Sequence, residues 1–244
     1  MILSLLILAA CAVTATPDAA APEAAAAAAE ASATVDLQAA YKAAVADAAT
    51  PTPEEIVNTL TVISAENPAL VWEAAAGGRV KLLTWTGWDG YDGLVGQDTT
   101  LSREVWVTVA PELETACRAW GLDAAATTLR LEQLLGLPPN NGKTRFVAVF
   151  ARPEDLFRPC ASGSITAPTC GLDFAPDASE AHRAWIQNLR GSSYGDPGYP
   201  WTQLGYTYDW SGDGDEVGLT ELVIRAGASV GVASVSDVAT VCGG

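Results

Sequence analysis

Residues 219–235 read LTELVIRAGASVGVASV and contain two apolar segments separated by a glycine break. The segments 219–226 and 228–235 are rich in valine and other residues that favour an extended backbone, as strands usually are. The short break between them predicts a β-hairpin. The C-terminal part of the chain is therefore expected to form a sheet.

Strand and helix patterns alternate irregularly in the rest of the chain, without a steady β-α-β rhythm. Short apolar runs predict strands at 79–85 and 144–151, and alternating apolar residues predict a strand at 104–110. Helical spacing with start and stop residues predicts helices at 52–66, 111–121, 127–139 and 177–190. This mixture predicts the α+β class, with a single compact mixed domain.

Composition divides the chain of 244 residues into an N-terminal region and a domain. Residues 12–50 contain 20 alanines, two prolines and almost no large apolar side chain, so they bury too little surface to offset chain entropy. We expect a signal peptide at 1–10, a disordered tether with the first cysteine at 11–50 and the globular domain at 51–244.

The acidic charge excludes one class of partner. The net charge is −16 for the chain and −12 for residues 51–244, which repels phosphate backbones. We therefore expect no nucleic-acid partner. The same charge suits a soluble surface that faces the medium.

The N-terminus carries the pattern of an export signal. Residues 2–10 are apolar apart from Ser4, too short to span a bilayer, and they end at Leu8-Ala9-Ala10-Cys11. This ending resembles the lipobox of bacterial lipoproteins. The resemblance implies cleavage before Cys11, lipidation of its thiol and anchoring in the lipid bilayer of a bacterial cell envelope, facing the periplasm or the outside. A simple cleaved signal and a buried N-terminal segment are the alternatives.

Four further cysteines predict two disulfides in an oxidising compartment. Cys160 and Cys170 flank a nine-residue loop, so a local bridge is the natural pairing there. Cys117 then pairs with Cys242. Their spacing and the single histidine argue against a zinc site.

An acidic loop near the C-terminus offers a calcium alternative. It resembles the start of an EF-hand loop, but its twelfth position is Thr220 where a glutamate is needed. An acidic turn between strands is the competing interpretation. We otherwise expect no cofactor. The candidate calcium ligands are Asp209, Ser211, Asp213 and Asp215.

Aromatic residues concentrate in two glycine-rich loops, around 85–92 and 199–210, with aspartates between them. Such loops suit a ligand pocket, where rings stack on apolar faces and carboxylates accept hydrogen bonds. The alternative is that the rings anchor the loops to the core. The candidate ligand-binding residues are Trp88, Asp89, Tyr91, Tyr199, Trp201, Tyr206, Tyr208 and Asp209.

The sequence contains no constellation that indicates a particular reaction. We expect a membrane-anchored binding or envelope-assembly module whose aromatic loops contact a glycan, a peptide or an envelope protein. One alternative is a carboxylate-dependent hydrolase acting on glycans, with Asp89 and Asp209 as acid–base candidates. The other is a purely structural envelope protein.

Overall fold

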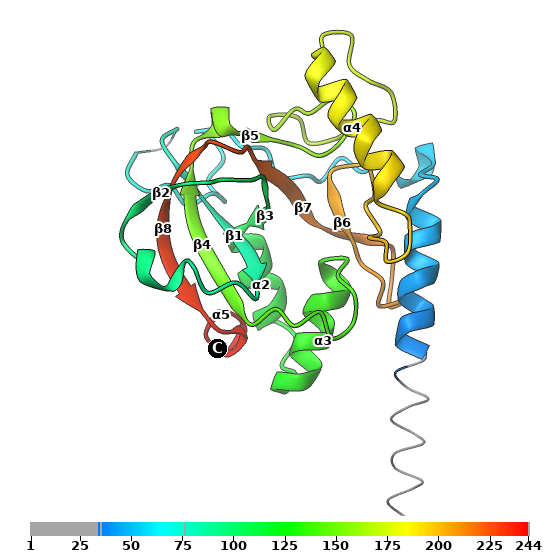
Figure 1. Cartoon of the computed structure of the whole chain (residues 1–244), viewed down its shortest axis with the longest axis horizontal. Coiled ribbons are helices and arrows are strands. Elements are labelled where there is room, and N and C mark those ends of the chain that lie inside the picture. Colours follow the sequence, from blue (N-terminus) through cyan, green and yellow to red (C-terminus); the bar gives the residue numbers. More distant parts are fainter. Residues whose placement is uncertain (1–33, 35, 76, 244) are drawn as a thin grey trace, which may run out of the picture. The chain divides into compact units, whose positions relative to one another are not determined.

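The computed structural model of the protein describes residues 34, 36–75 and 77–243. Within this part of the chain, the residues from Gln38 onward form one compact unit. An antiparallel sheet of eight strands is combined with helices in it, so the predicted mixed α+β class is confirmed (Figure 1).

The sheet follows the order β2-β8-β4-β1-β3-β7-β5, and β6 also pairs with β7, nearer to the start of that strand than β5 does. The strands are β1 (Val80–Thr86), β2 (Asp98–Thr100), β3 (Val105–Val109), β4 (Arg145–Ala151), β5 (Leu156–Phe157), β6 (Tyr206–Tyr208), β7 (Val217–Ile224) and β8 (Ser229–Ser236). The helices are α2 (Ala110–Arg118), α3 (Ala124–Leu134), α4 (Glu180–Ser192) and α5 (Val238–Cys242), with single 3-10 turns at Pro53–Glu55, Asp92–Leu94 and Pro153–Asp155.

The expected hairpin at 219–235 is wrong, although both of its strands form. β7 and β8 do not pair with each other, because β4, β1 and β3 lie between them in the sheet. Instead, β7 runs on into β8 through a bend, which Figure 1 shows at the top of the sheet. Gly227 adopts a φ of 85° in this bend, a conformation that favours glycine.

A second bent segment follows the first in register. Asp98 pairs with Gly231, and Val105 pairs with Ile224. These two pairs are separated by seven residues along both segments, so neither segment gains a residue over the other through the bend. Between these pairs, Leu101 donates its backbone N–H to Ala228 and accepts one from Gly227. β2–β3 and β7–β8 therefore act as two long, bent strands, and the sheet curls back on itself.

Alternation along the strands gives the sheet two apolar faces. Val80 and Leu82 of β1 belong to the core inside the curl, which also receives the valines of β3, β4 and β8. Leu83 and Trp85 point the other way, into a second core beneath α2, α3 and α5. Both faces of the central strands are thus covered, which explains their nearly continuous apolar sequences.

The helix predicted at 52–66 is also wrong beyond its first turn. Thr52 and Glu55 form the expected capping box around a single 3-10 turn. The chain then runs extended, and the backbone N–H groups of Leu60 and Ile63 donate to Pro168 and Ile165. Both side chains are buried. The extended segment therefore places in the core the same apolar residues whose spacing suggested a helix. The helices predicted at 111–121, 127–139 and 177–190 are confirmed in α2, α3 and α4.

Both predicted disulfides are present. Cys117 of α2 is bonded to Cys242 of α5, and Cys160 is bonded to Cys170. Two disulfides indicate an oxidising, non-cytoplasmic location. None of the helices in the described part of the chain combines the length and apolar character needed to cross a bilayer.

The compact unit begins earlier than the expected boundary at residue 51. A helix covers residues 36–48, and its apolar side is buried at Tyr41, Ala44, Val45 and Ala48. Tyr41 donates its hydroxyl to the carbonyl of Gly198 at 2.8 Å and packs edge-on against Trp210. The last part of the expected tether is therefore a docked helix. The predicted signal at 1–10, Cys11 and the tether up to residue 33 lie outside the described residues.

The docked helix predicts a contrast between two neighbouring alanines. Ala44 is buried and Ala43 is exposed. Ala44→Asp places a charge against the domain and should lower the free energy of unfolding by at least about 2 kcal/mol. Ala43→Asp, the matched control, should change it by less than about 0.5 kcal/mol. Urea unfolding followed by circular dichroism measures both, and equal effects would contradict the docking.

Candidate functional site

A cavity of about 740 Å³ opens on the side of the sheet that carries Leu83 and Trp85. Its floor is a row of three cross-strand neighbours, Leu83 of β1, Thr108 of β3 and Glu221 of β7. The walls come from the loop after β1, the segment between α3 and β4, and the loop before β6. A cavity of this volume falls in the range of small-molecule sites.

Aromatic rings make up much of the lining of the cavity, and most of them are held in place by ring contacts or hydrogen bonds with neighbouring residues. Trp85 of β1 stacks on Phe146 of β4, with ring centroids 5.3 Å apart. The indole N–H of Trp201 donates to the carbonyl of Pro159, and the backbone carbonyl of Trp201 accepts a hydrogen bond from the Tyr194 hydroxyl. Trp88 is held edge-on against Tyr91 and is 59% exposed at the rim. The aromatic wall is therefore tightly packed in the deep part of the cavity and exposed to solvent at its rim.

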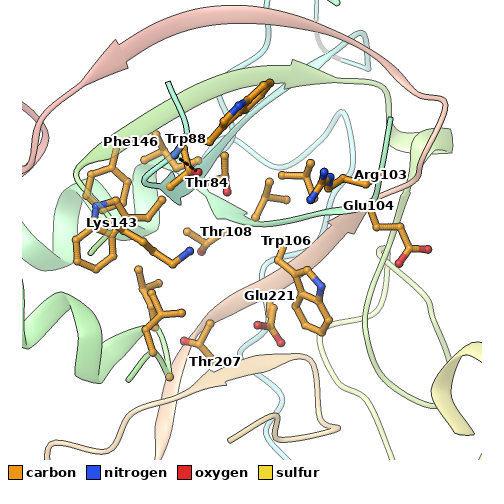
Figure 2. A pocket seen from close by; sticks show the side chains of 18 of the residues that line it. Thr84, Trp88, Arg103, Glu104, Trp106, Thr108, Lys143, Phe146, Thr207 and Glu221 are labelled. Atoms are coloured by element: carbon orange, nitrogen blue, oxygen red, sulfur yellow. Dashed lines mark hydrogen bonds between the residues drawn. The ribbon is translucent and has the colours of Figure 1, made fainter. Parts of the chain in front are cut away.

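Glu221 is the polar centre of the floor (Figure 2). Its Oε2 atom is buried and has no hydrogen-bond partner among the described residues, and the same holds for Oγ1 of Thr108 directly opposite. The rest of the Glu221 side chain is partly accessible, and the space it lines is the cavity. Burial raises the pKa of the Glu221 carboxyl to about 8, so the group is mainly neutral at neutral pH.

Two basic side chains also line the cavity. Lys143 extends into it in Figure 2, toward the row that holds Thr108 and Glu221. Burial lowers the pKa of the Lys143 ammonium. Arg103 lies at the exposed edge. Burial raises the pKa of the nearby Tyr91 phenol, and the positive charge of Arg103 partly opposes that rise. In the described part of the chain, neither cation has a carboxylate within ion-pairing distance.

The structure brings five of the eight candidate ligand-binding residues to this cavity. They come from both aromatic loops and are Trp88, Tyr91, Tyr199, Trp201 and Tyr208. Asp89, Tyr206 and Asp209 do not line it. Asp89 is exposed, and the Tyr206 hydroxyl donates to the carbonyl of Glu55 at 3.0 Å.

Asp209 has a structural partner that the sequence did not indicate. Both of its carboxylate oxygens accept hydrogen bonds from the guanidinium of Arg130 on α3, at 3.0 and 2.5 Å. The acid–base role considered for Asp89 and Asp209 is therefore not supported, because the two carboxylates do not meet at the cavity. The acids that do line it are Glu104 and Glu221.

The candidate calcium residues form turns and do not form a ligand set. Ser211 accepts the backbone N–H of Asp213, and Asp215 accepts that of Val217. Asp209 is occupied by Arg130. Within residues 36–75 and 77–243, no three acidic, histidine or cysteine side chains gather in a group that could hold a metal ion. The acidic turn is the interpretation that fits.

Glu221, Lys143 and Thr108 were missed in the sequence. One signal for Glu221 exists: it is the only charged residue between Leu219 and Ile224, in a strand that is mostly apolar. Such a residue normally marks the solvent face of a strand. Here the strand is covered on both faces, so the same acid is enclosed.

No protein-family model matches the chain, and neither the curated proteins nor the solved structures contain a significant match to it.

The Glu221 carboxyl predicts a specific pH dependence of stability. The folded protein keeps a proton on this group up to about pH 8, whereas in the unfolded chain the carboxyl has the ordinary glutamate pKa of 4.5 and loses its proton there. Stability should therefore fall as the pH rises through this interval, by up to roughly 1.4 kcal/mol for each pH unit, and level off above it.

The measurement compares Glu221→Gln with the wild type in urea unfolding from pH 5 to pH 9. The variant should lack this component of the slope and should gain stability relative to the wild type as the pH rises. Glu66→Gln at an exposed position is the matched control and should follow the wild-type profile. Parallel profiles for Glu221→Gln and the wild type would show that Glu221 ionises freely.

Proposed function

We propose that this protein is an exported binding module whose cavity takes a small ligand with an apolar or aromatic body and a polar end. The observation that supports this most is the cavity itself, with aromatic walls and an unpartnered buried carboxyl on its floor. A buried polar atom without a partner costs stability, so a ligand that bonds to it gains affinity. Such unsatisfied groups are typical of functional sites.

Binding is favoured over hydrolysis by the placement of the acids. A glycosidase needs two carboxyls that face one substrate from about 5–10 Å apart. The second acid along the cavity, Glu104, is exposed and accepts a hydrogen bond from the Trp185 indole at 2.8 Å. Glu221 therefore has no evident catalytic partner.

Binding is also favoured over a purely structural role. Trp88 and Tyr199 are 59% and 53% exposed, and both line the cavity. Rings that serve only to anchor loops are buried, as Trp210 is, which does not line the cavity. The exposed pair gives the cavity an apolar rim that a ligand can cover.

We further propose that Cys11 anchors the module to a bacterial envelope membrane. This proposal is supported by the lipobox-like sequence Leu8-Ala9-Ala10-Cys11 and agrees with the oxidising location that the disulfides indicate.

The binding proposal predicts that the neutral naphthalene dye N-phenyl-1-naphthylamine enters the cavity with a stoichiometry of one. The assay uses the full chain carrying Cys11→Ser, which keeps attached lipid from binding the dye. Dye fluorescence should rise and tryptophan fluorescence should fall on titration. Thr108→Phe fills the floor of the cavity and should weaken binding at least about tenfold.

Trp88→Ala, which leaves the buried core intact, should weaken dye binding several-fold through loss of the rim contact. Leu122→Ala is the control, because Leu122 is an exposed apolar residue that does not line the cavity. Saturable binding that none of the cavity substitutions changes, or no saturable binding, would refute the proposed site.

The anchoring proposal predicts that radiolabelled palmitate is incorporated into the protein in a bacterial host with a lipoprotein pathway. Cys11→Ser should abolish this incorporation, because the thiol is the acceptor in the resembling family. Label that persists in the serine variant would exclude Cys11 as the lipidated residue.

A further inference from the structure

Three polar side chains of the cavity can donate a hydrogen bond and have no partner among the described residues. Lys143 carries an ammonium that has no acceptor among the described side chains. Thr108 has an unpartnered hydroxyl on the floor. The neutral Glu221 carboxyl adds one further O–H donor. A ligand that supplies acceptors would match all three groups, whereas a ligand with donors alone would leave the Lys143 ammonium without a partner.

The charges of the cavity are also unbalanced. Lys143 and Arg103 are the basic residues along its lining, and Glu104 and Glu221 are the acidic ones. Glu104 offsets one of the two cations, although its carboxylate also accepts the Trp185 indole N–H, and Glu221 is mainly neutral. One positive charge therefore remains in excess in an otherwise strongly acidic protein, whose net charge is −16.

Burying the Lys143 ammonium costs free energy, and this cost indicates a role in ligand binding. Its side chain is half-buried beside apolar and aromatic walls, and burial alone lowers its pKa. A buried ammonium without a counter-ion is unfavourable, and a ligand anion would remove that cost by pairing with it. Lysine is a compact point charge that suits a single carboxylate or similar anion.

We propose that the cavity selects an amphiphilic organic anion, a small apolar or aromatic body with one carboxylate that is bound by Lys143. This inference rests on the proposed binding function and specifies its ligand class. The apolar body lies against the rings of Trp85, Trp106 and Phe146, and Arg103 adds positive charge at the entrance. Thr108 and the Glu221 O–H are the further donors available to the carboxylate oxygens.

The test uses three naphthalene probes that differ only in the charge of one group: 2-naphthoate, 2-naphthamide and 2-naphthamidine. They are nearly isosteric, and they are respectively anionic, neutral and cationic. Isothermal titration calorimetry at neutral pH with the full chain carrying Cys11→Ser should find 2-naphthoate bound about tenfold more tightly than 2-naphthamide. The amidine should bind most weakly.

Lys143→Met keeps most of the side-chain volume and removes the charge. It should abolish the preference for 2-naphthoate and leave the affinity for 2-naphthamide nearly unchanged. Lys81→Met is the matched control, because Lys81 pairs with Glu114 and does not line the cavity. It should keep the tenfold preference.

The outcomes separate the two proposals. If 2-naphthamide or the amidine binds as tightly as 2-naphthoate, the anion inference fails while the binding function stands. A preference for 2-naphthoate that survives Lys143→Met would also overturn the inference, since the carboxylate would then be bound elsewhere. If none of the three probes binds and the neutral dye does not bind either, the proposed function itself fails.

Discussion

The pairing of two bent strands is the constraint on which this structure depends. β2–β3 and β7–β8 keep one register through the bend, with a seven-residue interval on both sides between the pairs Asp98–Gly231 and Val105–Ile224. A shift of one residue would turn every side chain to the opposite face of the sheet. The shared register therefore decides that Thr108 and Glu221 lie side by side on the cavity floor.

A buried arginine holds the loops that surround the curled sheet. The guanidinium of Arg158 donates to the carbonyls of Thr61, Ser164 and Ala167 at 2.9–3.3 Å. These bonds tie the extended segment at 56–63 to the loop closed by the Cys160–Cys170 disulfide. Burial lowers the pKa of Arg158 only to about 10, with Glu112 opposing the shift, so the group stays charged and keeps all its donors. This arrangement explains why the segment after Pro53 is extended where its apolar spacing suggested a helix.

The sequence could predict the features that are determined by residues close together in the chain. The strands at 79–85 and 144–151 follow from short apolar runs, and the Cys160–Cys170 bridge follows from a short loop. The hairpin at 219–235 was wrong because pairing is decided by distant strands, β3 and β2, and no local pattern distinguishes a turn from a bend. Glu221 was missed for the same reason: its enclosure requires both faces of β7 to be covered. The aromatic loops could be found because their composition is unusual in itself, and five of their residues do meet at one cavity.

The protonation state of one carboxyl decides the charge balance of the cavity. A neutral Glu221 leaves the lining with one excess positive charge, whereas an ionised Glu221 would offset it and remove the expected preference for an anion. Infrared difference spectroscopy between the wild type and Glu221→Gln at neutral pH observes this group directly. We predict the C=O stretch of a protonated carboxylic acid in the wild type that is lost in the variant. A difference spectrum that contains only carboxylate bands would contradict the account.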